Sequence, residues 1–480
     1  MKSIFTLLLA ATSLVSGPNI PSSVKVQDKV DNGSPGSVCY ADAYNNLGNN
    51  WNRTYLSTEP QQVHMSLLDD SKFFRVQFAT LEEIDESILS YWPKNHGRHS
   101  PKKTTLTGKD WTFIDGGSAQ RELYLHNIQT RKLKPNTKFY YQVGARKAES
   151  IKWSKIYEFH TASLKKDFSF IATGDVGACN AVAVSHMMEY GKTHKYDFVT
   201  IAGDQAYNMA DFNGTKGDEY LNFMQDLFAN VPYLGAVGNH EATYNFSHYK
   251  NRFDIVPFAE SGFSNSMMYS INYKSLHLVS FSTEIYFEGS DEEIQTGINW
   301  LEADLAKANE QRDKRPWIIV MTHHPIYCSG NSEDCTTKAE TIRNGPGIHN
   351  QTKGGIEEIL LKYDVDVYMS GHVHNYERTY PVARGKVTST SYHNAPSFFQ
   401  LVIGNAGQPE GPSAFEDGPF PDFSAFRYDS YGFSTVKVTP TSLHIVHHKA
   451  NPNGSMGPVV DYFTVTKDAN HHKKNGKCDP

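Results

Sequence analysis

The chain has 480 residues, more than one hydrophobic core usually holds, so two or three domains are expected. With 39% hydrophobic and 20% charged residues, its composition is that of a globular protein and excludes a disordered or fibrous one. The formal net charge of −6, without a basic stripe, argues against nucleic-acid binding.

Residues 1–17 predict a secretory signal peptide. Lys2 precedes the apolar run Ile4–Ala11, and small residues at Ser16 and Gly17 fit a cleavage site. The run is too short for a membrane span, and no later stretch reaches the roughly 18 apolar residues that a span needs. A short buried helix is the alternative. We therefore expect a secreted or lysosomal/extracellular protein, with residues 18–58 as an N-terminal extension and no membrane span.

Glycosylation sequons and cysteines are consistent with secretion. Asn-x-Ser/Thr sequons in polar, turn-like contexts begin at Asn32, Asn52, Asn213, Asn245, Asn350 and Asn453. Because the chain has five cysteines, at least one has no partner within it. Cys328 and Cys335 flank a short polar loop, and their spacing predicts a local disulfide bond. The pairing of Cys39, Cys179 and Cys478 stays open, as do an intermolecular bridge and a homodimer.

Residues 59–164 predict an all-β domain. Segments such as Phe73–Phe78 and Phe139–Val143 alternate with a period of two between turn residues, which is typical of a small antiparallel β-sandwich. Leu133–Phe139 resembles the loop before a late strand of fibronectin type III domains. That family usually has a tyrosine where this chain has Phe139, so we do not predict its corner hydroxyl bond.

Residues 165–466 predict an α/β domain, because apolar strands alternate with helical segments. The expected strands are 168–173, 197–202, 233–237, 317–321 and 365–369, followed by apolar segments at 398–403 and 442–447. The expected helices are 181–190, 218–229, 292–309 and 355–362. Residues 467–480 read as a solvated C-terminal tail.

Polar side chains gather in five short stretches, most of which directly follow a predicted strand. The stretches are Gly174–Gly177, Gly203–Tyr207, Gly238–Glu241, Val320–His323 and Gly371–His374. Since open α/β sheets bind ligands at the carboxyl ends of their strands, we expect these side chains to meet.

The side-chain types in these stretches predict a site for two metal ions. Asp175 and Asp204 are carboxylates, and one of them would bridge two cations and neutralise their repulsion. Tyr207 offers a phenolate, a hard anionic ligand that favours a trivalent ion, although a lone tyrosine is more often a packed aromatic. The neutral donors are the amide of Asn239 and the imidazoles of His323, His372 and His374.

In order and residue type, the five stretches resemble the metal-binding signature of purple acid phosphatases, within the calcineurin-like metallophosphoesterase superfamily. The resemblance covers roughly residues 59–448 and implies a fibronectin III-like β-sandwich followed by an α/β metallophosphoesterase domain with two β-sheets flanked by helices. The Cys328–Cys335 loop looks closer to the animal branch. The resemblance implies that Asp175, Tyr207 and His374 bind Fe(III), that Asp204 bridges, and that Asn239, His323 and His372 hold a divalent zinc, iron or manganese ion.

The implied function is that of a secreted acid phosphatase, hydrolysing small-molecule phosphate monoesters by attack of a metal-bound hydroxide. His240 corresponds to the family's histidine beside the phosphate, where it orients the substrate or protonates the leaving oxygen; a structural hydrogen bond is the alternative. Glu241 is expected to be structural. His324 either contacts substrate or points away.

Two other functions fit the same sequence. A phosphodiesterase or nucleotide pyrophosphatase would use the same kind of site, but most such relatives lack the tyrosine found at Tyr207. A catalytically silent secreted binding or antigenic protein would keep the fold alone. The complete set of predicted ligands argues against that reading.

Overall fold

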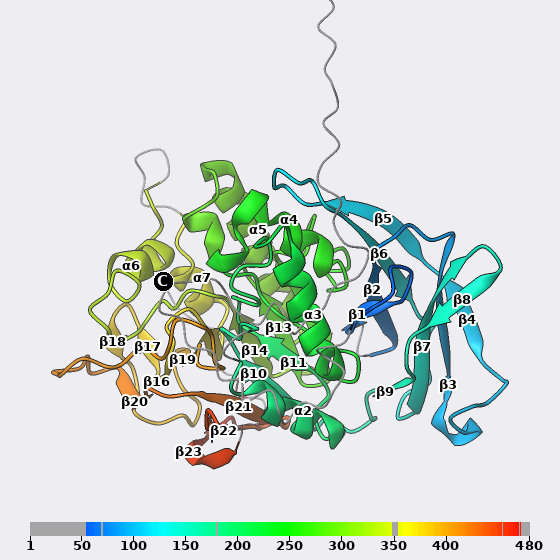
Figure 1. Ribbon diagram of the computed structural model, residues 1–480. Coiled ribbons are helices and arrows are strands. Elements are labelled where there is room, and N and C mark those ends of the chain that lie inside the picture. Colours follow the sequence, from blue (N-terminus) through cyan, green and yellow to red (C-terminus); the bar gives the residue numbers. More distant parts are fainter. Residues whose placement is uncertain are drawn as a thin grey trace, which may run out of the picture.

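The computed structural model describes residues 54–68, 71–178, 181–347, 354–453, 455–469 and 471. The signal peptide, the sequons at Asn32, Asn52 and Asn350, and the cysteines Cys39, Cys179 and Cys478 lie outside these ranges. Figure 1 shows a β-rich part, in blue and cyan, beside a larger α/β part, in green to red. Among the described residues, no helix is long and apolar enough to cross a membrane.

The β-rich part is a sandwich of two antiparallel sheets, which confirms the predicted all-β domain. One sheet has the order β1-β2-β6-β5, with β1 Gln61–Leu68, β2 Phe73–Thr80, β6 Glu122–Gln129 and β5 Lys109–Ile114. The other has the order β4-β3-β7-β8, with β4 Thr104–Thr107, β3 Glu86–Pro93, β7 Lys138–Lys147 and β8 Ser150–Trp153; β9 (Tyr157–His160) also pairs with β7, and the short helix η2 is Lys94–His96. Aromatic side chains pack together in the core: the ring of Phe159 stacks on that of Phe139, with centres 5.2 Å apart, and is tilted against that of Phe74, with centres 4.6 Å apart.

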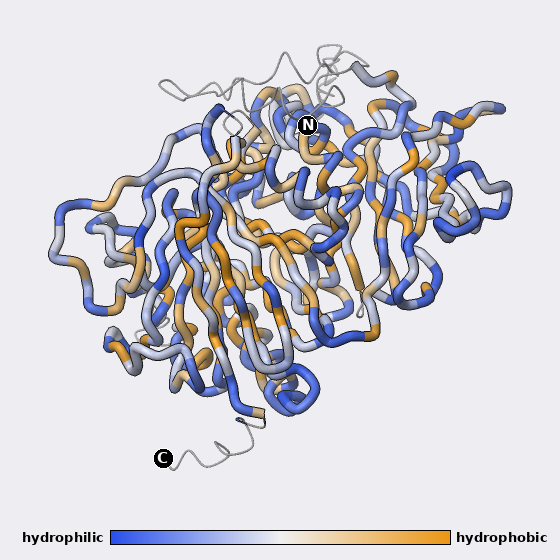
Figure 2. Tube along the Cα trace, turned by 90° about the horizontal axis from the view of Figure 1, so that it is seen from below, coloured by the Kyte–Doolittle hydropathy of each residue, from blue (hydrophilic) through white to orange (hydrophobic). Residues whose placement is uncertain are grey.

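The α/β part contains two large sheets, as predicted. The five-stranded sheet has the order β11-β10-β21-β22-β23, with β11 Val199–Ile201, β10 Phe168–Thr173, β21 Gly432–Val438, β22 Ser442–Ala450 and β23 Met456–Thr466. The seven-stranded sheet has the order β12-β13-β14-β15-β19-β16-β20, with β12 Tyr269–Tyr273, β13 Leu276–Ser280, β14 Trp317–Met321, β15 Val367–Ser370, β19 Phe399–Ile403, β16 Tyr376–Thr379 and β20 Ser424–Tyr428. A small hairpin joins β17 (Val382–Ala383) and β18 (Lys386–Val387). Figure 2 shows the hydrophobic stretches mainly in the interior strands and the hydrophilic ones in the surrounding loops.

Helices accompany the two sheets. They are α2 Val184–Lys192, α3 Thr215–Phe228, α4 Thr243–Arg252, α5 Asp291–Asn309, α6 Thr337–Asn344 and α7 Glu357–Lys362, with the short helices η3 Asn239–Glu241 and η4 Thr283–Tyr286. The start of α5 is capped by Ser290, whose side chain accepts a hydrogen bond from the backbone N–H of Glu293, while the Glu293 carboxylate accepts one from the backbone N–H of Ser290.

The predicted strand at 233–237 is wrong. This segment forms only isolated parallel bridges, Tyr233 with Val199 and Ala236 with Ala202. The carbonyl of Gly235 accepts hydrogen bonds from the Tyr249 and Tyr269 hydroxyls instead of from a neighbouring strand. The N–H groups of Leu234 and Ala236 still donate to the carbonyls of Val199 and Ile201, at 2.9 and 2.8 Å, so the segment follows β11 without forming a regular strand.

The β-sandwich is fastened to the α/β domain along the edge of β1. The backbone N–H groups of Gln62 and Val63 donate to the side chains of Asn222 and Gln225 on α3, at 3.0 and 2.8 Å. An unpaired strand edge is open to pairing with another chain, and here a helix covers it. Helix α3 also contacts the loop of Asp204, because the Tyr220 hydroxyl donates to Oε1 of Gln205 at 3.0 Å.

Candidate metal centre

Two neighbouring loops at the carboxyl ends of β10 and β11 carry the two predicted carboxylates. Asp175 and Asp204 both have positive φ, 57° and 50°, a region that costs a residue with a side chain roughly 1 kcal/mol or more. The loops are joined by backbone hydrogen bonds, from Val176 to the carbonyl of Asp204 at 3.1 Å and from Gly177 to that of Gln205 at 2.8 Å. This pairing holds both buried carboxylates on the same side of the sheet.

Glycines before the predicted ligands allow close approach. A Cβ on Gly203 would lie 2.3 Å from Nδ1 of His323, and one on Gly371 would lie 2.3 Å from Oδ2 of Asp175. Any side chain at either position would displace a predicted ligand. The Gly-Asp and Gly-His pairs of the sequence are thus explained by packing.

Three predicted ligands form a tight group on one side of the centre. Oδ1 of Asn239 lies 2.9 Å from Nε2 of His323 and 3.0 Å from Nδ1 of His372, and the two ring nitrogens are 3.2 Å apart. Oδ2 of Asp204 lies 3.2 Å from the same Nε2 of His323. Four side chains that are distant in sequence thus direct donor atoms at one point.

The outer nitrogens of the two histidines are already bound. Nδ1 of His323 donates to the carbonyl of Ala202 at 2.8 Å, and Nε2 of His372 lies 3.0 Å from the carboxylate of Asp334. In neutral rings, the inner nitrogens therefore present lone pairs to each other and to Asn239. A cation between them relieves this repulsion, so the donor set fits a metal ion.

A proton can satisfy the same donors. Burial opposes a charge on His323, yet the Asp204 carboxylate raises its pKa well above the ordinary value. Burial and the neighbouring His324 lower the pKa of His372 to about 4, so that ring stays neutral. Burial also opposes ionisation of Asp204, but His323 and His240 outweigh it and lower the carboxyl pKa. The pair Asp204–His323 is therefore ready to exchange a proton for a metal ion.

The remaining ligands form a second group. The Tyr207 hydroxyl lies 3.1 Å from Oδ1 of Asp175 and 3.0 Å from Nε2 of His374. That nitrogen is 3.5 Å from the same carboxylate oxygen. Burial, then Asp175 and Asp204, raise the pKa of Tyr207 well above 10, so only a strong cation beside it would favour the phenolate.

The two groups adjoin each other through the carboxylates. Asp175, Asp204 and His323 offer ligand atoms that all lie within 4.8 Å of one another. The structure thus brings together all seven side chains that the sequence singled out as ligands, in two sets with Asp204 beside both.

His240 lies at the open edge of the centre. Its Nδ1 lies 2.7 Å from Oδ1 of Asn208, which can only accept, so Nδ1 carries the proton. Its Nε2 then faces inward, 3.9 Å from Asp204 and 3.6 Å from Glu410. The predicted catalytic residue is therefore oriented toward the predicted metal ligands; Asn208 and Glu410 had not been singled out from the sequence.

Two neighbours of the ligands are buried supports. The Glu241 carboxylate accepts backbone hydrogen bonds from Asp204, Gln205 and Gly238, at 3.1, 2.8 and 2.8 Å, and so holds the loop of Asp204. His324 packs its ring 3.8 Å from that of His372, centre to centre, and its Nε2 lies 3.4 Å from the buried Glu284. Of the two alternatives for His324, the structure favours the one without substrate contact.

Asp334 is a functional neighbour that sequence reasoning missed. It lies in the loop closed by the disulfide bond between Cys328 and Cys335, which the structure contains as predicted. The available signal was an acidic residue directly beside a cysteine of that predicted loop. Its contact with His372, 38 positions further along, becomes visible only in the fold.

Three predicted sequons lie in the described part of the chain. Asn213, Asn245 and Asn453 are all exposed, as an attached glycan requires.

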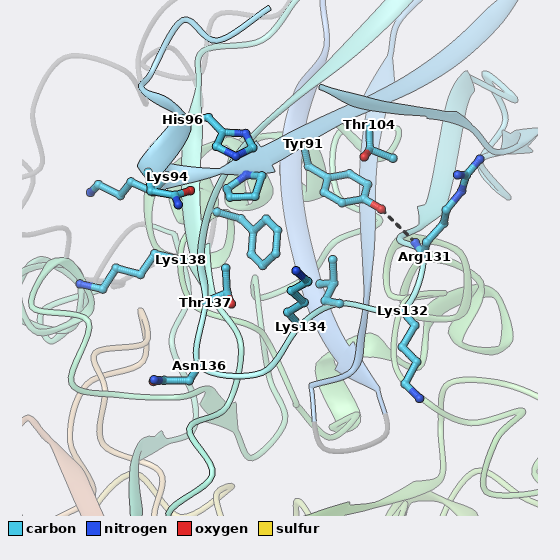
Figure 3. Close-up of a pocket in the computed structure, with 14 residues that line it drawn as sticks. Tyr91, Lys94, His96, Thr104, Arg131, Lys132, Lys134, Asn136, Thr137 and Lys138 are labelled. Atoms are coloured by element: carbon cyan, nitrogen blue, oxygen red, sulfur yellow. Dashed lines mark hydrogen bonds between the residues drawn. The ribbon is translucent and has the colours of Figure 1, made fainter. Parts of the chain in front are cut away.

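A cavity of about 790 Å³ lies in the β-sandwich and shares no residue with the metal centre. Tyr91, Lys94, Arg131, Lys134 and Lys138 are among its lining residues. In Figure 3 these cationic side chains point in different directions rather than toward one point. We therefore assign it no ligand.

Comparisons with known proteins agree with this architecture. The family model of the calcineurin-like phosphoesterase matches residues 168–376, and that of the purple acid phosphatase N-terminal domain matches residues 60–161. A third, described as iron/zinc purple acid phosphatase-like protein C, matches residues 397–461. Fold, donor set and these matches define a metallophosphoesterase.

Comparison with individual proteins shows which family of metallophosphoesterases the chain resembles. Acid phosphatase type 7 of Danio rerio is 32% identical over 427 residues, covering 86% of this chain and 92% of its own. Its Homo sapiens counterpart is 32% identical over 419 residues, covering 85% and 91%. A purple acid phosphatase structure from yellow lupin seeds shares the fold, with a TM-score of 0.68 at 20% identity over 87% of this chain and 76% of that one. The chain belongs to the purple acid phosphatases and is a phosphatase enzyme.

Proposed function

We propose that this chain is a secreted acid phosphatase that hydrolyses small phosphate monoesters at a centre of one Fe(III) and one divalent ion. The observation that carries the proposal is the placement of His323 and His372, whose inner nitrogens face each other at 3.2 Å beside Asn239 and Asp204. With both rings neutral, buried donors in this arrangement repel one another, and a metal ion between them removes that repulsion.

The two groups of ligands differ in charge, and this asymmetry supports two different ions. Tyr207, with Asp175 and His374, offers two anionic oxygens, which suit a hard trivalent ion such as Fe(III). The other group is mainly neutral, which suits zinc, iron or manganese as a divalent ion. Asp204 would bridge the two ions and reduce their repulsion.

The chain's own residues prepare the reaction. When bound, the two ions supply Lewis acidity for the phosphoryl oxygens and acidify water. As an imidazolium, with a proton on each ring nitrogen, His240 would donate the Nε2 proton to the leaving oxygen and keep the Nδ1 proton that binds Asn208; this contact turns Nε2 toward the centre. Glu241 keeps the Asp204 loop in place through three backbone hydrogen bonds.

Secretion is the second element of the proposal. It is supported by the N-terminal sequence pattern of residues 1–17 and by the exposure of Asn213, Asn245 and Asn453. Expression in a eukaryotic cell, followed by enzymatic removal of N-linked glycans, should lower the mass of protein recovered from the medium. Protein that stays inside the cell and keeps its mass would contradict secretion.

One purification tests the enzymatic proposal. Metal analysis should find close to one iron and one divalent ion per chain, and the visible spectrum should show a tyrosinate–iron charge-transfer band. An aryl phosphate monoester should be hydrolysed faster at acidic than at neutral pH, and faster than the corresponding diester. A colourless, fully metallated and active protein would refute the iron assignment. A preference for the diester would favour the phosphodiesterase alternative.

A further inference from the structure

The ring of His372 is held from outside the centre by a residue without an assigned role. Nε2 of His372 lies 3.0 Å from Oδ1 of Asp334, and a carboxylate can only accept, so Nε2 carries the ring proton. Nδ1 must then be the nitrogen that faces Asn239 and His323. The ring of His324 packs against one face of the His372 ring. The Asp334 contact then determines which of the two ring nitrogens of His372 points toward the centre.

A disulfide bond next to Asp334 holds this residue in place. It directly precedes Cys335, whose disulfide partner Cys328 is buried. Before Cys328, the N–H of Tyr327 donates to Oε1 of Gln400 on β19 at 2.9 Å, and the carbonyl of Tyr327 accepts from Nε2 of that side chain at 2.6 Å. Because Tyr327 anchors Cys328 to β19, the disulfide bond also restrains Cys335 and Asp334 at the other end of this polar loop.

From these contacts we propose that Asp334 is a positioning residue that fixes the tautomer and orientation of His372, and that the Cys328–Cys335 disulfide holds it there. The inference rests on the proposed function, because it assigns Nδ1 of His372 to the divalent ion. Carboxylates that accept from a metal-bound imidazole orient the ring and increase its basicity. Affinity for the divalent ion therefore depends on a loop that contributes no ligand to the proposed set.

The alternative is that Asp334 forms only a surface ion pair. Nζ of Lys338, one turn further on, lies 2.8 Å from the same carboxylate. If that pair were its role, the variants Asp334→Ala and Lys338→Met would have the same effect. The positioning role instead predicts that only the first affects the metal.

The test is a metal titration of purified, iron-loaded protein from which the divalent ion has been removed by a mild chelator. Zn²⁺ is added in competition with a chromophoric chelator, for the wild type and for the variants Asp334→Ala, Asp334→Glu and Lys338→Met. In Asp334→Ala, affinity for Zn²⁺ should fall roughly 10- to 100-fold, the range typical of residues that support metal ligands. Asp334→Glu should recover part of this loss, and Lys338→Met should lie within about twofold of the wild type, as for an exposed ion pair.

A second readout separates positioning from general damage. The tyrosinate–iron band belongs to the other group of ligands, so it should keep its position and intensity in Asp334→Ala. The double variant Cys328→Ser/Cys335→Ser, which retains Asp334 but lacks the disulfide bond, should show a smaller loss of Zn²⁺ affinity in the same direction. If Asp334→Ala does not fold, Asp334→Asn decides the question, since loss of the charge alone should weaken Zn²⁺ binding about tenfold.

Unchanged Zn²⁺ affinity in a folded Asp334 variant, or equal loss of iron and zinc, would overturn the inference. The Zn²⁺ titration does not depend on hydrolysis. A wild type that binds both metals but cleaves no phosphate ester would therefore refute the proposed phosphatase activity without affecting the proposed positioning role of Asp334. A wild type that binds no second metal would refute both.

Discussion

The hydroxyl of Tyr207 lies 3.0 Å from Nε2 of His374, and both approach the same oxygen of Asp175. A packed aromatic, the common role of a lone tyrosine, would not direct its hydroxyl at a buried carboxylate and an imidazole. The ring of Tyr207 also packs against His240, with ring centres 4.2 Å apart. One side chain therefore connects the proposed iron site to the proposed proton donor.

Tyr207→Phe should separate these two roles. Because the ring is kept, packing against His240 should survive, while loss of the phenolate should abolish the visible band and lower iron content. Visible spectroscopy and metal analysis check this directly. Tyr462→Phe, on an exposed side chain, is the matched control and should keep the colour. A purple Tyr207→Phe protein would show that another residue is the chromophore.

Changes at Asp204 and Asn239 should differ in which metal they release. Asp204→Ala removes the proposed bridge, so both metals should be depleted and hydrolysis should fall by at least ~10²-fold. Asn239→Ala removes a neutral ligand from one group only, so it should deplete the divalent ion and spare iron. Metal analysis of the two variants, beside the exposed control Asp417→Asn, measures the difference. Identical depletion in both would contradict the asymmetric centre.

His240→Asn should slow the reaction without removing metal. General acids contribute roughly 10²- to 10⁴-fold, and the loss should be larger for esters whose alcohol is a poor leaving group. Turnover of aryl phosphates with leaving groups of increasing pKa would show a steeper dependence in the variant. The same slope as in the wild type would leave His240 with only its structural hydrogen bond to Asn208.

Strands are predicted correctly from this sequence where the pattern that marks them lies within a few adjacent residues. The strands Phe168–Thr173 and Trp317–Met321 were predicted with their observed ends, because each is an apolar run bounded by polar, glycine or proline residues. The predicted strand at 233–237 is not a regular strand: the segment pairs with β11 only through isolated bridges, and the Gly235 carbonyl binds tyrosine hydroxyls that no local pattern reveals.

The candidate metal centre likewise contains residues that the sequence predicts and residues that it does not. Each predicted ligand follows its own strand or turn, so residue type and position were sufficient to find it. Asp334 and Glu410 reach the centre from loops whose position depends on how β14, β15 and β19 pair. That pairing is a property of the folded chain, and the residues that support the ligands are therefore harder to read from sequence than the ligands themselves.

A buried ion network joins the two domains, and its central carboxylate should be worth several kcal/mol. Asp218 on α3 is fully buried and pairs with Arg121 of the sandwich and, at 2.9 Å, with Arg252 on α4. Asp218→Asn leaves two buried guanidinium groups without their counter-ion and should cost about 3–5 kcal/mol. Urea unfolding measures it.

Asp226→Asn, on the same helix, is the matched control for that network. Asp226 pairs with Lys155, but both side chains are partly exposed, so the cost should stay below about 1 kcal/mol. Equal costs for the two variants would mean that burial does not govern the strength of these ion pairs.

His447 should make the fold sensitive to acid, which matters for a protein proposed to work at low pH. Its Nε2 accepts from the amide of Asn405 at 3.1 Å, so Nδ1 carries the ring proton and lies 2.9 Å from the Ser434 hydroxyl. Burial, assisted by His448, lowers its pKa well below 6.5. Below pH 6.5 the unfolded chain binds a proton at this residue that the folded chain does not. The free energy of unfolding should therefore decrease as the pH is lowered, by up to about 1.4 kcal/mol per pH unit from this group.

In His447→Gln, which cannot take up a proton, the free energy of unfolding should depend less steeply on pH between 6.5 and the lower folded-state pKa. Its absolute value should also fall, because the stacking of His447 on Tyr376, at 3.9 Å between ring centres, is lost. Urea unfolding at several pH values separates the two effects, with the exposed His393→Gln as control. An unchanged pH dependence would mean that other buried groups, such as His64, dominate the response to acid; burial lowers the pKa of His64 to about 4.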